Sequence, residues 1–284
     1  MVPIPIKNLP FTKVGSMKTF LIFFLITSFA QAQISEVTIK NFNFLYSAPT
    51  GEGVADLFFY QKNNFDPQKV SVEKIGEEFK IHLEGVENQE IILSNPPGFL
   101  KNAQDMKLTS FNLNLKERAV VSMGSGVFHS PDEDINLKNF TLSCDRIISH
   151  PELMDQIVAG CVQKMFMKAG GFASEGGEGV TQAFIKAIDR SFEPMTGGFG
   201  LKNVELKIFG GKFDLTGDIK AQISGTAEAN GSMKYDVVAK KLTVKVSEIK
   251  FGYFDVTSKV FDELKKQESQ NLKVKEPYLY LMIK

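Results

Sequence analysis

A strict alternation of apolar and polar side chains over residues 213–236 constrains the fold more than any other feature of the sequence. The segment reads FDLTGDIKAQISGTAEANGSMKYD. Successive side chains of a β-strand point to opposite faces of a sheet, so every second residue from Phe213 shares one face. That face carries glycine, alanine and a set of large side chains, whereas the other face is polar. The large side chains are those of Phe213, Leu215, Ile219, Ile223, Met233 and Tyr235.

The parity of this alternation limits how the segment folds. One unbroken strand would be roughly 80 Å long, whereas typical strands extend about 17–20 Å. A two-residue hairpin loop would reverse the parity that faces inward, and no reversal occurs before Tyr235. We therefore expect one glycine-bent strand, or several strands joined by odd-length loops, with 229–231 as a candidate loop. The parity reverses after Tyr235, which predicts a four-residue loop over 237–240.

Four short segments share a second pattern, which predicts bent strands. In each, two apolar residues alternate, one extra residue intervenes, and the alternation resumes on the other parity. An extra residue in a strand is a β-bulge, which bends the strand and increases its twist. Chance similarity among amphipathic strands is the alternative explanation. The segments are VTIKNFNF (37–44), MKLTSFNL (106–113), INLKNFTL (135–142) and VKVSEIKF (244–251).

Helical periodicity is confined to the middle and the C-terminal part of the chain. Apolar residues recur at helical spacing over about 150–169, 179–193 and 255–270. The predicted fold class is α+β and β-rich, with long bent antiparallel sheets (meanders with bulges) packed on two or three amphipathic helices. The expected regions are 33–145 (β-rich), 146–200 (helical) and 201–284 (β-meander, helix and final strand, packed with the helical segment).

The N-terminus has the pattern of a secretory signal peptide. Lys18 precedes the apolar run 20–29, and the small-residue triplet Ala30-Gln31-Ala32 follows. The run is about half of the roughly 20 residues that a membrane-spanning helix needs. We expect cleavage near Ala32, a mature start near residue 33, and a periplasmic or extracellular location. A retained membrane anchor is the alternative.

Cys144 and Cys161 are the two cysteines of the chain. An exported chain with a small, even number of cysteines is expected to form a disulfide. The bridge would close a loop of 17 residues and stabilise the fold by about 3 kcal/mol. Two buried free thiols are the alternative.

Residues that could carry catalysis do not form a convincing set. The three histidines, His82, His129 and His150, lack metal-ligand spacing. The acidic stretch 129–134 (HSPDED) lacks the ligand frame of an EF-hand. Lysine plus arginine equals aspartate plus glutamate, at 33 each, which argues against nucleic-acid binding. We therefore expect a protein that is not an enzyme and that has no cofactor, metal site or nucleic-acid partner.

The apolar face of 213–236 is the best sequence clue to function. Exposing its six large side chains would cost roughly 12 kcal/mol at about 2 kcal/mol each, so the face must be covered. Either the predicted helices cover it completely as ordinary core, or they leave an elongated apolar cavity. Glycine and alanine on the face, and the pliable side chains of Met154 and Met165 on the first helix, favour a cavity. All eight large side chains are candidate ligand contacts.

The C-terminal part resembles bacterial periplasmic proteins of the tubular lipid-binding type. The resemblance covers about 190–284 and includes GSMKYD, a loop, LTVKV, a helix and the final PYLYL. It implies a lipid carrier or sensor without catalytic residues. The favoured function is thus an exported binding protein for a lipid or other elongated apolar ligand, with a membrane surface or an envelope protein as a further partner. The alternative is a structural or adhesion protein of the cell envelope with a dry core.

Overall fold

The computed structural model describes most of the chain beyond the predicted signal peptide. The described residues are 36–60, 63–65, 68–84, 88–93, 103–131, 133–176, 199–220, 224–266 and 268–283. The predicted signal peptide over 1–32, the predicted helix over 179–193 and the candidate ligand contact Ile223 lie outside them.

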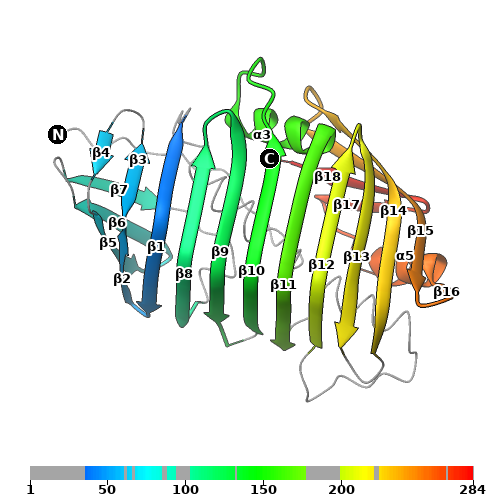
Figure 1. Ribbon diagram of the computed structural model, residues 1–284, viewed down its shortest axis with the longest axis horizontal. Helices are drawn as coiled ribbons and strands as arrows, with labels where there is room; N and C mark the ends of the chain where they lie inside the picture. Colours follow the sequence, from blue (N-terminus) through cyan, green and yellow to red (C-terminus); the bar gives the residue numbers. More distant parts are fainter. Residues whose placement is uncertain are drawn as a thin grey trace.

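The described chain forms one large antiparallel sheet of 18 strands (Figure 1). The first ten strands are β1 (Val37–Ser47), β2 (Thr50–Ala55), β3 (Leu57–Tyr60), β4 (Asn63–Phe65), β5 (Gln68–Ile75), β6 (Glu78–Glu84), β7 (Gln89–Leu93), β8 (Asp105–Leu115), β9 (Arg118–His129) and β10 (Glu133–Asp145). The remainder are β11 (Lys164–Gly176), β12 (Phe199–Phe209), β13 (Lys212–Lys220), β14 (Ser224–Asp236), β15 (Lys241–Phe251), β16 (Phe254–Asp255), β17 (Leu272–Lys275) and β18 (Tyr278–Met282).

Through most of the sheet, strands that are consecutive in the chain pair with each other. Strands β8 to β15 form a continuous meander that crosses the molecule. At one end β8 pairs with β1, followed by β2, β5, β6 and β7. At the other end β15 pairs with β18, which pairs with β17. The short strands β3 and β16 pair with the remaining lengths of β1 and β15, and β4 pairs with β3.

The prediction of an α+β fold packed on two or three helices is wrong, because the protein is mostly β. The described residues contain two helices, α3 (Leu153–Gln163) and α5 (Thr257–Lys265). The first helix ends at Gln163, and the expected helical residues 164–169 instead begin β11. Met165, Met167 and Ala169 fit strand alternation as well as helical spacing. Pairing of β11 with both β10 and β12 selects the strand.

The predicted bulges are confirmed in part: the register shifts between β1 and β8 and between β14 and β15, whereas β10 keeps its register with β9 and β11 through the third segment. Asn41, Ser110 and Asn139 take positive φ values at the extra residue of the first three segments. In the fourth segment the β14–β15 register skips one residue between Val246 and Glu248. Asn203 repeats the positive φ on β12, within a segment, LKNVELKI, that the sequence pattern did not single out. A left-handed backbone conformation costs free energy for most residues and costs less for asparagine. Positive φ values at these positions therefore indicate that the bend is a specific feature of the fold.

The two ends of the sheet fold over its apolar face, hereafter the inner face. Near β1 and β8–β10, Val70 of β5 and Leu83 of β6 join a closed core with Leu113 and Val121. At the opposite end, α5, β17 and β18 close a second core over β13 and β15. Figure 1 shows β5–β7 at the end of the sheet beside β1, and β17–β18 behind the strands at the opposite end. The polar side of the meander is the outer face.

The parity predictions for 213–236 are confirmed, except for the candidate loop. Strands β13 and β14 pair from Lys220 opposite Ser224, so three residues connect them and the inward parity is kept. A four-residue turn over 237–240 joins Asp236 to Lys241, as predicted. Residues 229–231 do not form a loop, because they pair with β13 and β15 within β14.

Candidate functional site

A band of half-buried apolar side chains lies on the inner face between the two closed cores. The band consists of Met165, Met167, Leu206, Leu215, Ala229 and Met233, from β11 to β14. Met167 lies opposite Leu206, Leu206 opposite Leu215, and Leu215 opposite Ala229. Directly paired residues of antiparallel strands share a face, so these four form one row across the sheet.

The band differs from its surroundings in how well it is covered. Met165 packs partly against both closed cores, which places the band between them. Helix α3 packs on β10, β11, β12 and β14, and α5 packs on β15 and β17. On either side of the band, residues such as Leu142 and Ile249 are buried. The band is therefore less covered than the buried residues that flank it.

Three predicted ligand contacts belong to this band, and two do not. Leu215, Met233 and Met165 are half-buried members of the band. Phe213 and Ile219 are only 6% and 3% exposed and belong to the second closed core. They flank Leu215 on the inner face, and a ligand lying on the band would touch little of either.

Two glycines of the alternating face do not leave the open space that the sequence suggested. The ring of Phe213 lies 2.6 Å from the position that a Cβ at Gly231 would take. The ring of Phe251 lies 2.6 Å from the corresponding position at Gly225. The aromatic rings thus fill the places where the glycines lack side chains. The shallow part of the band is instead at Ala229.

Tyr235 contributes to a polar cluster beneath α3. Its hydroxyl donates to Oδ1 of Asp155 at 2.7 Å, and Lys240 contacts the other carboxylate oxygen. Lys240 also lies 2.8 Å from Glu152 Oε2. Burial and the bond to Asp155 raise the pKa of Tyr235. Burial lowers the pKa of Lys240, but its bonds to both carboxylates outweigh this effect and raise it.

This cluster has a structural role. Asp155 is 1% exposed, and a buried carboxylate needs compensating partners. Tyr235 and Lys240 supply them from the end of β14 and the following turn, so the cluster fixes α3 to the sheet. Met154, the remaining predicted contact, is half-buried on the same helix. The structure does not bring Met154 or Tyr235 into the row of the band.

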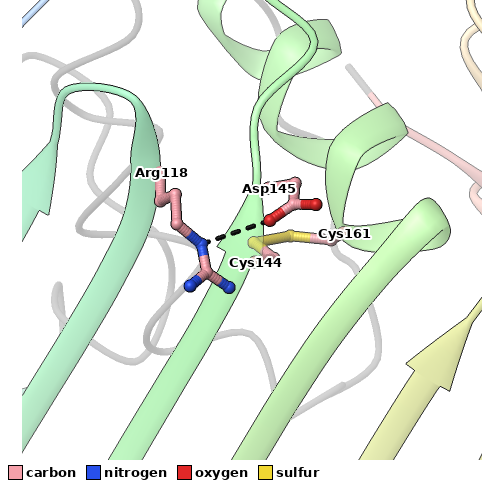
Figure 2. Close-up of a disulfide and its surroundings, with 4 residues drawn as sticks. All are labelled: Arg118, Cys144, Asp145 and Cys161. Atoms are coloured by element: carbon pink, nitrogen blue, oxygen red, sulfur yellow. Dashed lines mark ion pairs between the residues drawn. A yellow bond between two sulfur atoms is a disulfide. The ribbon is translucent and has the colours of Figure 1, made fainter.

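The predicted disulfide is confirmed and anchors the other side of α3. Cys144 and Cys161 are bonded, with a Cα–Cα distance of 4.7 Å. Figure 2 shows the bridge between β10 and α3, beside the ion pair of Arg118 Nε and Asp145 Oδ1 at 3.2 Å. A Cβ at Gly160 would lie 2.0 Å from the Asp145 carbonyl oxygen. Glycine at this position therefore allows the helix to approach the strand closely.

The described residues do not offer the side-chain chemistry of a metal centre. Among them, no group of three or more His, Cys, Asp and Glu side chains is arranged to hold a metal ion. His129 lies 2.9 Å from Asp134, and His82 lies 3.4 Å from Glu90, in half-exposed pairs. Neither of the described helices is long and apolar enough to cross a bilayer.

Comparison with protein families, curated proteins and solved structures finds no match to this chain. The apolar band is thus the feature from which function is argued. Leu206 on β12 was not identified by the sequence pattern, although FGLKNVEL (199–206) fits the bulge frame and would have predicted Leu206 to face inward.

Proposed function

We propose that the protein binds a lipid or another elongated apolar ligand along the apolar band, as an exported, non-enzymatic carrier of the cell envelope. The observation that carries this proposal is the unbroken row of half-buried side chains between two closed cores. A stable soluble protein gains from covering such surface, and a ligand can supply the cover.

The energy available at the band fits weak, reversible binding. A large apolar side chain gains about 2 kcal/mol on full burial. The five large members, Met165, Met167, Leu206, Leu215 and Met233, are already more buried than exposed, so each leaves roughly 0.5 kcal/mol for a ligand to recover and together they offer about 2–3 kcal/mol. This corresponds to a dissociation constant on the order of 10 mM before contacts beyond the band are counted.

The shape and composition of the band suit a chain-like ligand. Four adjacent strands about 4.8 Å apart give the row a length of roughly 14 Å. Three of the six members are methionines, whose flexible side chains adapt to ligands of different shape. The bent sheet keeps the row on the inner side, between the two ends that fold over it.

Export is supported by the disulfide and by the N-terminal sequence. Disulfides persist in oxidising compartments such as the periplasm or the extracellular space. The bonded pair of Cys144 and Cys161 fits such a compartment. The charged, apolar and small-residue pattern of 1–32 is typical of a signal peptide.

Native mass spectrometry of protein purified without detergent tests the proposal. The wild type should carry bound apolar molecules, or take up a long-chain fatty acid when it is added. Leu215→Trp should abolish this binding, because the larger side chain fills the row. Thr216→Trp places the same side chain on the outer face of β13 and should leave binding intact.

The alternative function predicts a different result. A structural or adhesion protein with a dry core would give ligand-free spectra before and after addition of lipid. Equal binding by Leu215→Trp and Thr216→Trp would show that any ligand lies elsewhere. Circular dichroism and melting curves of both variants establish that each is folded.

A further inference from the structure

The outer face of the C-terminal part carries a concentration of lysines that the neutral total charge conceals. The group, hereafter the lysine patch, consists of Lys212, Lys234, Lys241, Lys245, Lys273 and Lys275, on strands β13, β14, β15 and β17. Five of the six are exposed and Lys241 is half-buried. None of them forms an ion pair with a described residue, whereas many other lysines do.

Strand register places these lysines together. Lys212 lies opposite Ser232, Ser232 opposite Lys245, Lys245 opposite Tyr278, and Tyr278 opposite Lys275. The next row runs from Lys234 through Thr243 and Tyr280 to Lys273. Since paired residues share a face, both rows lie on one surface. A third, shorter row joins Asp236, Lys241 and Met282.

The patch has a net positive charge and an aromatic centre. Asp236 is the one acidic side chain among the described residues of these three rows, and it accepts the Ala239 N–H. The rings of Tyr278 and Tyr280 stack at 6.1 Å between the lysines. Lys241 Nζ lies 6.0 Å above the Tyr280 ring. Within these three rows, six lysines against one aspartate leave a charge of +5 (6 − 1), and the adjacent row carries Asp214 and Glu248.

Protection of a sheet edge does not explain this arrangement. Lysines on an exposed edge discourage pairing with another chain, which accounts for Lys273 and Lys275 on β17. Lys212, Lys234 and Lys245 lie on interior strands with both edges paired. Like charges placed this close repel one another, so their concentration calls for an anionic partner.

We propose that the lysine patch docks the protein on an anionic membrane surface. A sheet face presents its charges over a broad area, as a lipid headgroup layer does. Lysine attracts anionic headgroups as a point charge, without the bidentate geometry by which arginine recognises individual phosphates. Tyrosine favours the membrane–water interface, because its ring is apolar and its hydroxyl is polar. Charge complementarity therefore selects an anionic bilayer as the occupant.

Docking in this way leaves the apolar band free. The patch lies on the outer face and the band on the inner face of the same strands, since Lys234 and Met233 are consecutive in β14. Vesicle binding should therefore not depend on whether the band holds an apolar ligand. A Leu215→Trp variant should accordingly bind vesicles as the wild type does.

Co-sedimentation with vesicles tests the docking surface. The full mature chain should bind vesicles of phosphatidylcholine with 30% phosphatidylglycerol and should not bind pure phosphatidylcholine. Each lysine near a membrane contributes about a fivefold factor to binding. Lys245→Gln/Lys273→Gln/Lys275→Gln should therefore lower the partition coefficient by about a hundredfold. Raising the ionic strength from 0.1 to 0.5 M should release the wild type.

A matched control removes the same charge elsewhere. Lys40→Gln/Lys107→Gln/Lys138→Gln replaces three exposed lysines of β1, β8 and β10 and should change partitioning only slightly. Equal losses in the two triple variants would overturn the patch as the docking surface. Equal binding to neutral and anionic vesicles would also overturn it. Tighter binding to a DNA duplex than to anionic vesicles, at equal phosphate concentration, would exclude the membrane as the partner.

Discussion

Two parts of the sheet use the same bending device but differ in how their inner face is covered. In the closed part, β1 and β8–β10, Asn41 Nδ2 donates to Asp56 at 3.0 Å. In the open part, β11–β14, Asn203 Nδ2 donates to Asp218 at 2.8 Å. In both, an asparagine with positive φ bonds an aspartate fifteen residues later.

The comparison shows that the bending of the sheet and the covering of its inner face have different structural causes. The closed part is covered by β5 and β6, which bring Val70 and Leu83 onto the inner face. Its Leu113 is 1% exposed, whereas Leu215 of the open part is half-buried. Bulges therefore curve the sheet in both parts. In the closed part, strands β5 and β6 also pack over the inner face and exclude water from it. The open part keeps a partly exposed row of side chains on its inner face.

The largest expected effect contrasts one leucine from each part. Leu113→Ala should lower the free energy of unfolding by roughly 3–4 kcal/mol, because it leaves a cavity in a closed core. Leu215→Ala should cost less, about 1–2 kcal/mol, since part of its side chain is already exposed. Urea unfolding followed by circular dichroism measures both. Equal losses would show that the two parts are equally well packed.

Removal of the disulfide should have the next largest effect. Cys144→Ser/Cys161→Ser releases a 17-residue loop and should lower the free energy of unfolding by about 3 kcal/mol. The closed part should lose most protection, because α3 joins its core through Leu153 and Ile157. Hydrogen exchange read by mass spectrometry locates the loss. Uniform deprotection of the whole sheet would contradict a local anchoring role.

Tyr235 tests whether α3 depends on the polar cluster beneath it. Tyr235→Phe removes the donor to buried Asp155 and should lower the free energy of unfolding by roughly 1–3 kcal/mol. Tyr253→Phe is the control, because Tyr253 is fully exposed at a hairpin tip. Thermal unfolding of the two variants gives the comparison. A Tyr235→Phe variant as stable as the control would contradict a structural role for the cluster.

The smallest expected effect concerns the bulge of the open part. Hydrogen bonds from Asn203 and Thr226 lower the pKa of Asp218. A depressed carboxyl pKa stabilises the fold above the ordinary value near 3.8, and this stabilisation is lost as pH falls through the folded pKa. Asn203→Ala should raise the pKa toward the ordinary value, as NMR titration of the Asp218 carboxyl carbon would show. An unchanged pKa would mean that the bulge does not position the carboxylate.

Local patterns of the sequence predicted the features that depend on neighbouring residues. The alternation of 213–236 established the inward residues and the odd-length connection between β13 and β14. The extra residue in segments such as 37–44 predicted the bulges. The spacing and number of cysteines predicted the bridge from Cys144 to Cys161. Each of these outcomes is decided by strand geometry over a few residues or by simple chemistry.

Features that depend on distant pairing were not predictable in the same way. Residues 164–169 of β11 fit both helical spacing and strand alternation, and pairing with β10 and β12 decides between the two. The ring of Phe251 fills the place beside Gly225 from a neighbouring strand. The lysine patch joins residues from 212 to 275. The total composition does not reveal this local positive charge, because acidic residues elsewhere in the chain balance it.

The most direct test of the open band uses the absence of tryptophan from the chain. Met167→Trp places one fluorophore in the band, and Lys168→Trp places one on the outer face of the same strand, at the next residue. Titration with a brominated fatty acid should quench the emission of the Met167→Trp variant to a saturable limit and leave the emission of the Lys168→Trp variant unchanged. Absence of saturable quenching in Met167→Trp, or equal quenching in both variants, would contradict a ligand site on the inner face.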